Sequence, residues 1–120
     1  MSNELEVVSS RTETEVGIIK WGVGKGIPLT PSNALSQMEK TLEEHDEVVA
    51  EIKKFLAGGG GSADARHKIK MELGDMFVTL ALQCGIWGTS WEECASMALE
   101  KISKRKGKIV DGKFVKDGKG

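Results

Sequence analysis

Apolar side chains recur at helical intervals along the middle of the chain. Between residues 31 and 56 they fall on one side of a helix: Leu35, Met38, Leu42, Val49, Ile52 and Leu56. This spacing predicts an amphipathic helix. Thr30 suits the capping position before it, and Pro31 suits its first turn. The pattern therefore predicts a helix that begins at Pro31 and continues through Leu56.

The next helical segment is apolar on nearly every side. One row consists of Ile69, Leu73, Met76, Leu80, Cys84 and Trp87, and the opposite side carries Met71, Val78 and Leu82. A helix of this kind belongs in a core. A glycine-rich stretch, residues 58–62, separates it from the first amphipathic helix and predicts a flexible link. The two helices can then fold back antiparallel.

The two ends of the chain give weaker signals. Residues 4–21 are interpreted as a first helix, although several β-branched residues weaken it. The glycine-rich stretch after Trp21 is interpreted as a connection. A phosphate-binding loop is the alternative, but it would need a preceding strand and a Gly-Lys-Ser/Thr ending, which this stretch lacks. Ser90 and Glu93 form a capping box for a last helix that ends near Gly107. The dipeptide Asp111-Gly112, between short apolar pieces, predicts a β-hairpin.

Together these elements predict one domain, residues 1–120, with an all-α fold of about four helices and a small C-terminal β-hairpin. Residues 108–120 form a basic tail. With 39% hydrophobic residues the chain can bury only a modest core, so association with a second copy would help it. There is no apolar run of about 18 residues and no leader sequence, and a cytoplasmic protein without a membrane partner is expected.

Two short acidic motifs stand out, Glu44-His-Asp-Glu47 and Glu72-Leu-Gly-Asp75, with 24 residues between them. Positions i and i+3 of a helix are neighbours, so each motif presents two carboxylates together. The motifs lie equally far from the glycine link, and an antiparallel pair of helices would align them. Four close carboxylates repel unless divalent cations lie between them. Oxygen ligands favour Mg²⁺, with Mn²⁺ as a substitute.

For the first motif alone, a solvated acidic surface is the simpler interpretation. The second motif favours metal, because carboxylates on a core helix must be paired, protonated or metal-bound. His45, between the acidic residues, is interpreted as solvated. Cys84 and Cys94 could form a disulfide, but a pair of reduced, buried thiols is the favoured interpretation. Trp21 is the best of the three tryptophans for contact with a nucleobase, although an aromatic residue at a helix end more often packs in a core or interface.

A longer series of motifs carries a resemblance. It consists of Glu43-Glu44-x-x-Glu47, Glu72-Leu-Gly-Asp75, Trp91-Glu-Glu-Cys94 and Glu100-Lys-Ile-x-Lys-Arg-Lys-Gly107. In this order they resemble the MazG-type, all-α nucleotide pyrophosphohydrolases, over residues 18–116. The ending, residues 107–115, resembles the tail of short, single-domain members of phages and bacteria.

The resemblance implies an oligomeric helical bundle, either a homodimer or a homotetramer. It implies Mg²⁺-dependent hydrolysis of nucleoside or deoxynucleoside triphosphates to the monophosphate and pyrophosphate. The implied catalytic residues are Glu43, Glu44, Glu47, Glu72 and Asp75, the last four of which would hold the metal. Phosphate contacts would come from Lys101, Lys104 and Arg105. Many relatives carry asparagine where this chain has Leu99 or Glu100, so any role of that asparagine is not carried over.

Two other functions remain open at this point. One is a specialised hydrolase for dUTP, dCTP or a modified nucleotide. The other is a non-enzymatic helical partner protein that binds nucleic acid through its basic end. Residues 101–120 hold eight Lys or Arg against two Asp, a net charge of +6, which leaves −7 on the first 100 residues. Phe114 is the only aromatic residue of that end, so a stacking platform is missing and nucleic acid is the less favoured partner.

Overall fold

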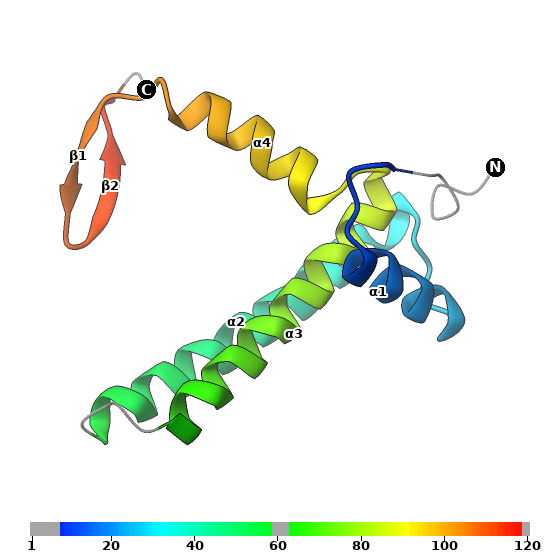
Figure 1. The fold of residues 1–120 in the computed structure, drawn as a ribbon, viewed down its shortest axis with the longest axis horizontal. Coiled ribbons are helices and arrows are strands. Elements are labelled where there is room, and N and C mark those ends of the chain that lie inside the picture. The colour runs from blue at the N-terminus through cyan, green and yellow to red at the C-terminus, as the bar shows by residue number, and fades with distance from the viewer. Residues whose placement is uncertain (1–7, 59–62, 119–120) are drawn as a thin grey trace.

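The structure is a computed structural model, and it describes residues 8–58 and 63–118. Within these residues the chain forms four α-helices, a 3₁₀ turn and a two-stranded antiparallel sheet, which confirms a mostly helical fold. Two long helices pack antiparallel, a short one lies across their end, and the last helix projects away from them (Figure 1). None of the described helices is long and apolar enough to cross a membrane.

The first helix, α1, spans Glu13–Gly24, so the predicted range 4–21 was wrong at both ends. It begins where the Thr12 hydroxyl accepts a hydrogen bond of 3.0 Å from the Glu15 backbone N–H. Residues 4–7 lie outside the described part of the chain. The helix continues through Gly22 because this buried glycine packs against Leu82, where a Cβ would meet the leucine at 2.6 Å. The predicted connection after Trp21 therefore starts one turn later, and Gly22 and Gly24 belong to a helix rather than to a phosphate-binding loop.

The two long helices are α2, Ala34–Ala57, and α3, Ala63–Trp87. A 3₁₀ turn, Pro31–Asn33, precedes α2, and Pro31 opens it as predicted. The Thr30 side chain does not cap the backbone there, because its hydroxyl pairs with the Ser32 hydroxyl at 2.9 Å. Gly58 follows the last residue of α2, whereas residues 59–62 of the predicted link lie outside the described ranges. The antiparallel return of α3 along α2 is confirmed.

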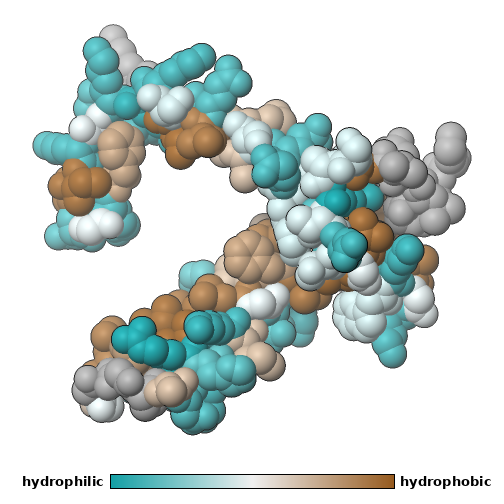
Figure 2. Space-filling view, in the orientation of Figure 1, coloured by the Kyte–Doolittle hydropathy of each residue, from teal (hydrophilic) through white to brown (hydrophobic). Residues whose placement is uncertain are grey.

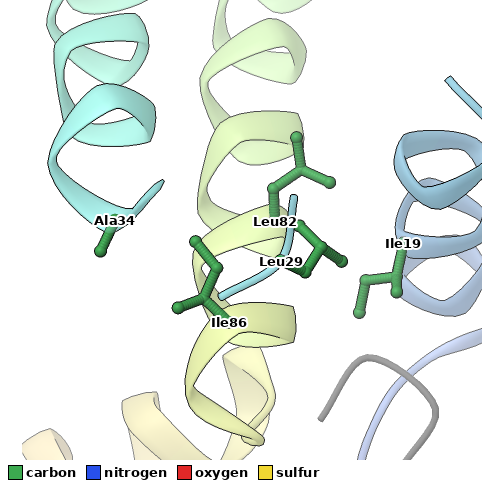
Figure 3. Packing of buried hydrophobic residues seen from close by; sticks show 5 residues of the cluster. All are labelled: Ile19, Leu29, Ala34, Leu82 and Ile86. Carbon is green, nitrogen blue, oxygen red and sulfur yellow. The ribbon is translucent and has the colours of Figure 1, made fainter. Parts of the chain in front are cut away.

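The main core lies at one end of this helical hairpin. Five buried residues meet there: Ile19 of α1, Leu29 of the connection to α2, Ala34 of α2, and Leu82 and Ile86 of α3 (Figure 3). Along the rest of the hairpin, α2 turns the smaller side chains of Thr41 and Val48 toward α3. The core of a single chain is therefore confined to the end where α1 crosses the hairpin.

The apolar row of α2 lies outside this core. Leu35 is 80% exposed, Leu42 60% and Leu56 68%. On α3, Leu73 and Trp87 are exposed as well, so the expectation that their whole row is buried was wrong within one chain. Helical spacing identified the apolar sides correctly, but neighbouring segments of the same chain do not cover them.

The last helix, α4, spans Trp91–Ile102, and Ser90 caps it by accepting a hydrogen bond of 3.0 Å from the Glu93 backbone N–H. Only this half of the predicted capping box forms, because the Glu93 carboxylate instead accepts a hydrogen bond from the Thr89 hydroxyl. The helix ends at Ile102 rather than near Gly107, where the first strand begins. Arg11 and Glu15 hold the start of α4: Arg11 Nε donates to the Thr89 carbonyl at 2.9 Å, and Glu15 Oε2 accepts from the Trp91 N–H at 2.9 Å.

The predicted C-terminal hairpin is confirmed. Strand β1, Gly107–Val110, pairs with β2, Lys113–Lys116, in antiparallel register. The connecting residues Asp111 and Gly112 have φ angles of 51° and 75°, as a two-residue type I′ turn requires. Both strands are exposed along their whole length, so the hairpin stands clear of the described body of the chain.

Candidate metal centre

Three of the predicted acidic residues come together on the helical hairpin. Glu44 comes from α2, and Glu72 and Asp75 come from α3. One carboxylate oxygen from each lies within 4.8 Å of the others. Glu72 and Asp75 are one turn apart on the same side of α3, and the antiparallel packing places Glu44 opposite them. We call these three residues the acidic group.

The acidic group extends from a buried to an exposed position. Glu44 is only 8% exposed, Glu72 is half-buried, and Asp75 is exposed. Among the described residues, neither Glu44 Oε2 nor Glu72 Oε2 has a hydrogen-bond partner, although both atoms are buried. A buried carboxylate oxygen without a partner loses its hydration with no compensation. These residues therefore fit a divalent cation, since an all-oxygen ligand set suits Mg²⁺ or Mn²⁺.

Glu47, the fourth predicted ligand, lies beside the acidic group rather than within it. Its side chain is exposed. The Glu44 carboxylate, through a hydrogen bond and its negative charge, and then the charge of Glu72, raise the pKa of Glu47 above its ordinary value. Glu47 therefore lies close enough to Glu44 and Glu72 for their charges to affect its pKa. Glu43, also exposed, contacts the Lys40 ammonium at 3.5 Å on the same surface.

A pocket opens directly beside the acidic group. Its volume is about 490 Å³, and both Glu44 and Asp75 line it. A second pocket of about 460 Å³ lies between α1 and α3 and shares Trp21 and Asp75 with the first. The Trp21 side chain is half-exposed and lines both spaces. The predicted nucleobase contact is therefore placed next to the predicted metal ligands.

The residues predicted to bind phosphate do not lie at the pocket of their own chain. Lys101, Lys104 and Arg105 line neither described pocket. Lys101 is exposed on the last turn of α4, whereas Lys104 and Arg105 follow the helix instead of belonging to it. Lys104 contacts the Glu100 carboxylate at 3.6 Å. Their role with phosphate stays a prediction.

Two features of this region escaped the sequence-based prediction. Lys40 lies with its ammonium 3.4 Å from Glu44 Oε1 and lines the larger pocket. Its position four residues before Glu44 is a signal that could have identified it. The buried hydroxyl groups of Thr41 and Thr79 lie 2.8 Å apart between the two helices. That contact depends on how α2 and α3 pack, so the sequence alone does not reveal it.

The two cysteines do not belong to the acidic group. Both thiols are free, as expected, but only Cys84 is buried, so the expected burial of Cys94 was wrong. Burial raises the pKa of the Cys84 thiol to about 12, with smaller contributions from Cys94 and Glu15. Cys84 is thus a poor ligand for a soft metal at neutral pH.

A helical hairpin that gathers three carboxylates beside a pocket is consistent with the class of proteins that hold a divalent cation on carboxylates. The chain belongs to the MazG nucleotide pyrophosphohydrolase domain family, whose model matches residues 32–110. This range includes the whole acidic group and α4, whereas α1 precedes it. Comparisons with curated proteins and with solved structures give no match.

Proposed function

We propose that the protein is a Mg²⁺-dependent nucleoside triphosphate pyrophosphohydrolase. Water would attack the α-phosphorus of the nucleotide, the α–β anhydride bond would break, and the products would be a nucleoside monophosphate and pyrophosphate. The observation that carries the proposal is the pair of buried, unpartnered oxygens on Glu44 and Glu72, within reach of Asp75. The family supplies the class of reaction.

Each acidic residue has a role in this proposal. Glu44, Glu72 and Asp75 would hold the cation, with Glu47 at the edge of the group as a further ligand. The bound cation supplies positive charge that neutralises phosphate oxygens and lowers the pKa of water. Glu43, an exposed carboxylate that lines the larger pocket, or Glu47 where it does not hold the cation, would accept the proton of the attacking water.

The neighbouring pockets would hold the nucleotide. Trp21 lines both of them, and its half-exposed indole ring offers a stacking surface for a base. Lys101, Lys104 and Arg105 would stabilise the charge on the leaving pyrophosphate. Because α4 projects away from its own hairpin, we expect them to act on the site of a neighbouring copy (Figure 1).

Product analysis tests the reaction. The protein would be incubated with a panel of ribo- and deoxynucleoside triphosphates, including dUTP, dCTP and modified bases, with Mg²⁺ or with EDTA. We expect monophosphate and pyrophosphate only with the metal, and no product from Glu72→Gln or Asp75→Asn. Asp46→Asn, an exposed position on α2 outside the acidic group, is the matched control and should keep full turnover.

The same panel separates the alternatives. Turnover of one nucleotide alone would indicate a specialised hydrolase. No turnover by folded wild-type protein would contradict the proposal and favour a binding role. Unchanged turnover in both acidic variants would show that these carboxylates are structural.

Mixing two inactive proteins tests the role of the basic residues. One carries Glu72→Gln, and the other carries Met at Lys101, Lys104 and Arg105 together. Activity that returns on mixing would show that one copy supplies the carboxylates and another the cations. A mixture as inactive as its components, formed from proteins that exchange subunits, would contradict a shared site.

A further inference from the structure

Two thiols lie on either side of the corner at which α3 gives way to α4. Cys84 lies one turn before the end of α3, and Cys94 lies one turn after the start of α4. Both cysteines are free, but Cys84 is buried whereas Cys94 is exposed. Neither thiol takes part in the acidic group, so the pair is a separate chemical feature of the chain.

The backbone of the corner brings the two cysteines together. Gly88, with a φ angle of 64°, ends α3 in the left-handed conformation, and the Thr89 N–H then donates to the Cys84 carbonyl at 2.9 Å. The Thr89 hydroxyl oxygen lies 3.6 Å from Cys94 Sγ. One residue therefore contacts both cysteines, the first through its backbone and the second through its side chain.

The Cys84 thiol has a second neighbour, the carboxyl group of Glu15. Burial raises the pKa of Cys84 to about 12, and the Cys94 and Glu15 side chains raise it further, so both lie beside the thiol. Glu15 is 0% exposed, and its Oε2 accepts from the Trp91 N–H at 2.9 Å. Its Oε1 is buried and has no hydrogen-bond partner among the described residues. A proton acceptor without a donor is thus present next to the two thiols.

We propose that Cys84 and Cys94 form a reversible disulfide within one chain when a peroxide oxidises the protein, and that Cys94 reacts first. Exposure decides the order, because the peroxide reaches Cys94 directly. The buried Cys84 holds almost no thiolate and reacts only with a sulfur that is already beside it. This inference does not depend on the proposed function.

The oxidation takes place in two steps. The Cys94 thiolate attacks one peroxide oxygen and breaks the O–O bond, which leaves a sulfenic acid on Cys94. The departing hydroxide takes the proton that the thiol had released. The Cys84 sulfur then attacks the Cys94 sulfur, so that an S–S bond forms and the S–O bond breaks. Glu15 Oε1 accepts the Cys84 proton and passes it to the second departing hydroxide. Two thiols and one peroxide thus give one disulfide and two water molecules.

The disulfide would fasten α4 at the end that the rest of the chain already holds. Every residue of α4 after Trp91 is exposed. In the space-filling view an open space separates the far part of this helix from the α2–α3 hairpin (Figure 2). Only the start of α4 is in contact, where the Trp91 ring meets the Phe77 ring edge to face with 5.7 Å between the centroids. A covalent bond beside this contact would restrict the direction in which α4 projects.

Peptide mass spectrometry of the wild type tests the proposal without any variant. Cleavage after glutamate places Cys84 in the peptide 73–92 and Cys94 in the peptide 94–100. After treatment with hydrogen peroxide, we expect these peptides joined, with a summed mass lower by about 2 Da, and separated again by dithiothreitol. On a denaturing gel without reductant the protein should remain a single chain. Unjoined peptides with a sulfinic acid on Cys94, or a disulfide between two chains, would overturn the proposal.

Two serine variants test the order of the steps. In Cys84→Ser, the sulfenic acid on Cys94 should persist, and dimedone should trap at least about tenfold more of it than in the wild type. In native Cys94→Ser, Cys84 should remain a free thiol under the same treatment. Rapid oxidation of Cys84 in that variant would contradict the order.

Glu15→Gln tests the proton acceptor. Its amide oxygen can still accept from the Trp91 N–H, but an amide does not take up the thiol proton. We expect the sulfenic acid to form at the wild-type rate and the disulfide to form at least about tenfold more slowly. Glu13→Gln, an exposed position on the same turn of α1, is the matched control and should leave both rates unchanged. Equal disulfide rates in Glu15→Gln and the wild type would remove Glu15 from the mechanism.

Thermal unfolding tests whether the bond fits the corner. The oxidised wild type should melt at least about 3 °C above the reduced protein, because the disulfide restricts the unfolded chain. Cys84→Ser treated with the same peroxide controls for oxidation of methionine and should show no rise. A lower melting temperature for the disulfide form would show that the corner must distort to make the bond, and would contradict the fastening of α4.

Discussion

The hydroxyl groups of Thr41 and Thr79 lie 2.8 Å apart and join α2 to α3 inside the helical hairpin. Both residues are buried, and Thr79 in turn donates a hydrogen bond of 2.7 Å to the Met76 carbonyl. Thr41 is one turn before Glu44, and Thr79 is one turn after Asp75. This polar contact therefore fixes how the two helices are rotated where the carboxylates meet.

Replacement of Thr41 by Val should lower the free energy of unfolding by about 1 kcal/mol, because the shape is kept and the contacts of the hydroxyl with Thr79 and with the Gln37 carbonyl are lost. Urea unfolding followed by circular dichroism measures the change. Ser96→Ala removes an exposed hydroxyl on α4 and should alter stability by less than about 0.5 kcal/mol. A Thr41→Val protein as stable as the wild type would show that the contact adds nothing to the packing.

Replacement of two glycines of α1 by alanine should change the stability of the protein in opposite directions. At Gly22 the new Cβ would lie 2.6 Å from the buried Leu82 side chain, and the strain should cost about 1 kcal/mol or more. At Gly17 the Cβ meets nothing within 4 Å, and alanine should stabilise the helix by up to about 1 kcal/mol. Melting temperatures of the two variants, measured side by side, check the prediction. A stabilised Gly22→Ala protein would mean that α1 does not pack closely on α3.

Metal should change the thermal stability of the protein through the acidic group. Without metal, Glu44→Gln relieves repulsion among three close carboxylates, so this variant should melt at a higher temperature than the wild type in EDTA. With Mg²⁺ at a hundredfold excess over its dissociation constant, the wild type should gain about 2.7 kcal/mol. Glu44→Gln should gain far less. An equal response of both proteins to Mg²⁺ would place the cation elsewhere.

The two thiols should differ in reactivity. Because burial raises the pKa of Cys84 to about 12, this residue carries almost no thiolate at pH 8. Cys94 is exposed. A thiol-specific reagent should therefore label Cys94 quickly and Cys84 only after the protein unfolds, as peptide mass spectrometry would show. Native Cys94→Ser should show no rapid labelling, and fast labelling of that variant would contradict the burial of Cys84.

Local sequence signals predicted the elements whose formation depends on local chemistry. Ser90 caps the start of α4 because its hydroxyl accepts a hydrogen bond from a backbone N–H of the first turn. Asp111-Gly112 forms the hairpin turn because this pair adopts positive φ angles readily. The acidic group also followed from local rules. The i, i+3 spacing of Glu72 and Asp75 placed them on one side of α3, and the antiparallel return of the helices placed Glu44 opposite.

The features that were missed depend on contacts between elements. Periodicity shows which side of a helix is apolar but not which body covers it, so it did not predict that Leu35 and Leu42 would be exposed. The glycine-rich ending of α1 resembled a loop, and only the contact of Gly22 with Leu82 explains why it is helical. The place of Trp21 beside the acidic group likewise depends on how α1 crosses α3.

All three members of the acidic group belong to one uninterrupted segment, the hairpin between Ala34 and Trp87. A ribosome synthesises this segment before α4 and the two strands. The contacts that gather the carboxylates connect helices that follow each other in the chain, and such short-range contacts form rapidly. The ligand residues are thus brought together by contacts that do not require α4 or the two strands.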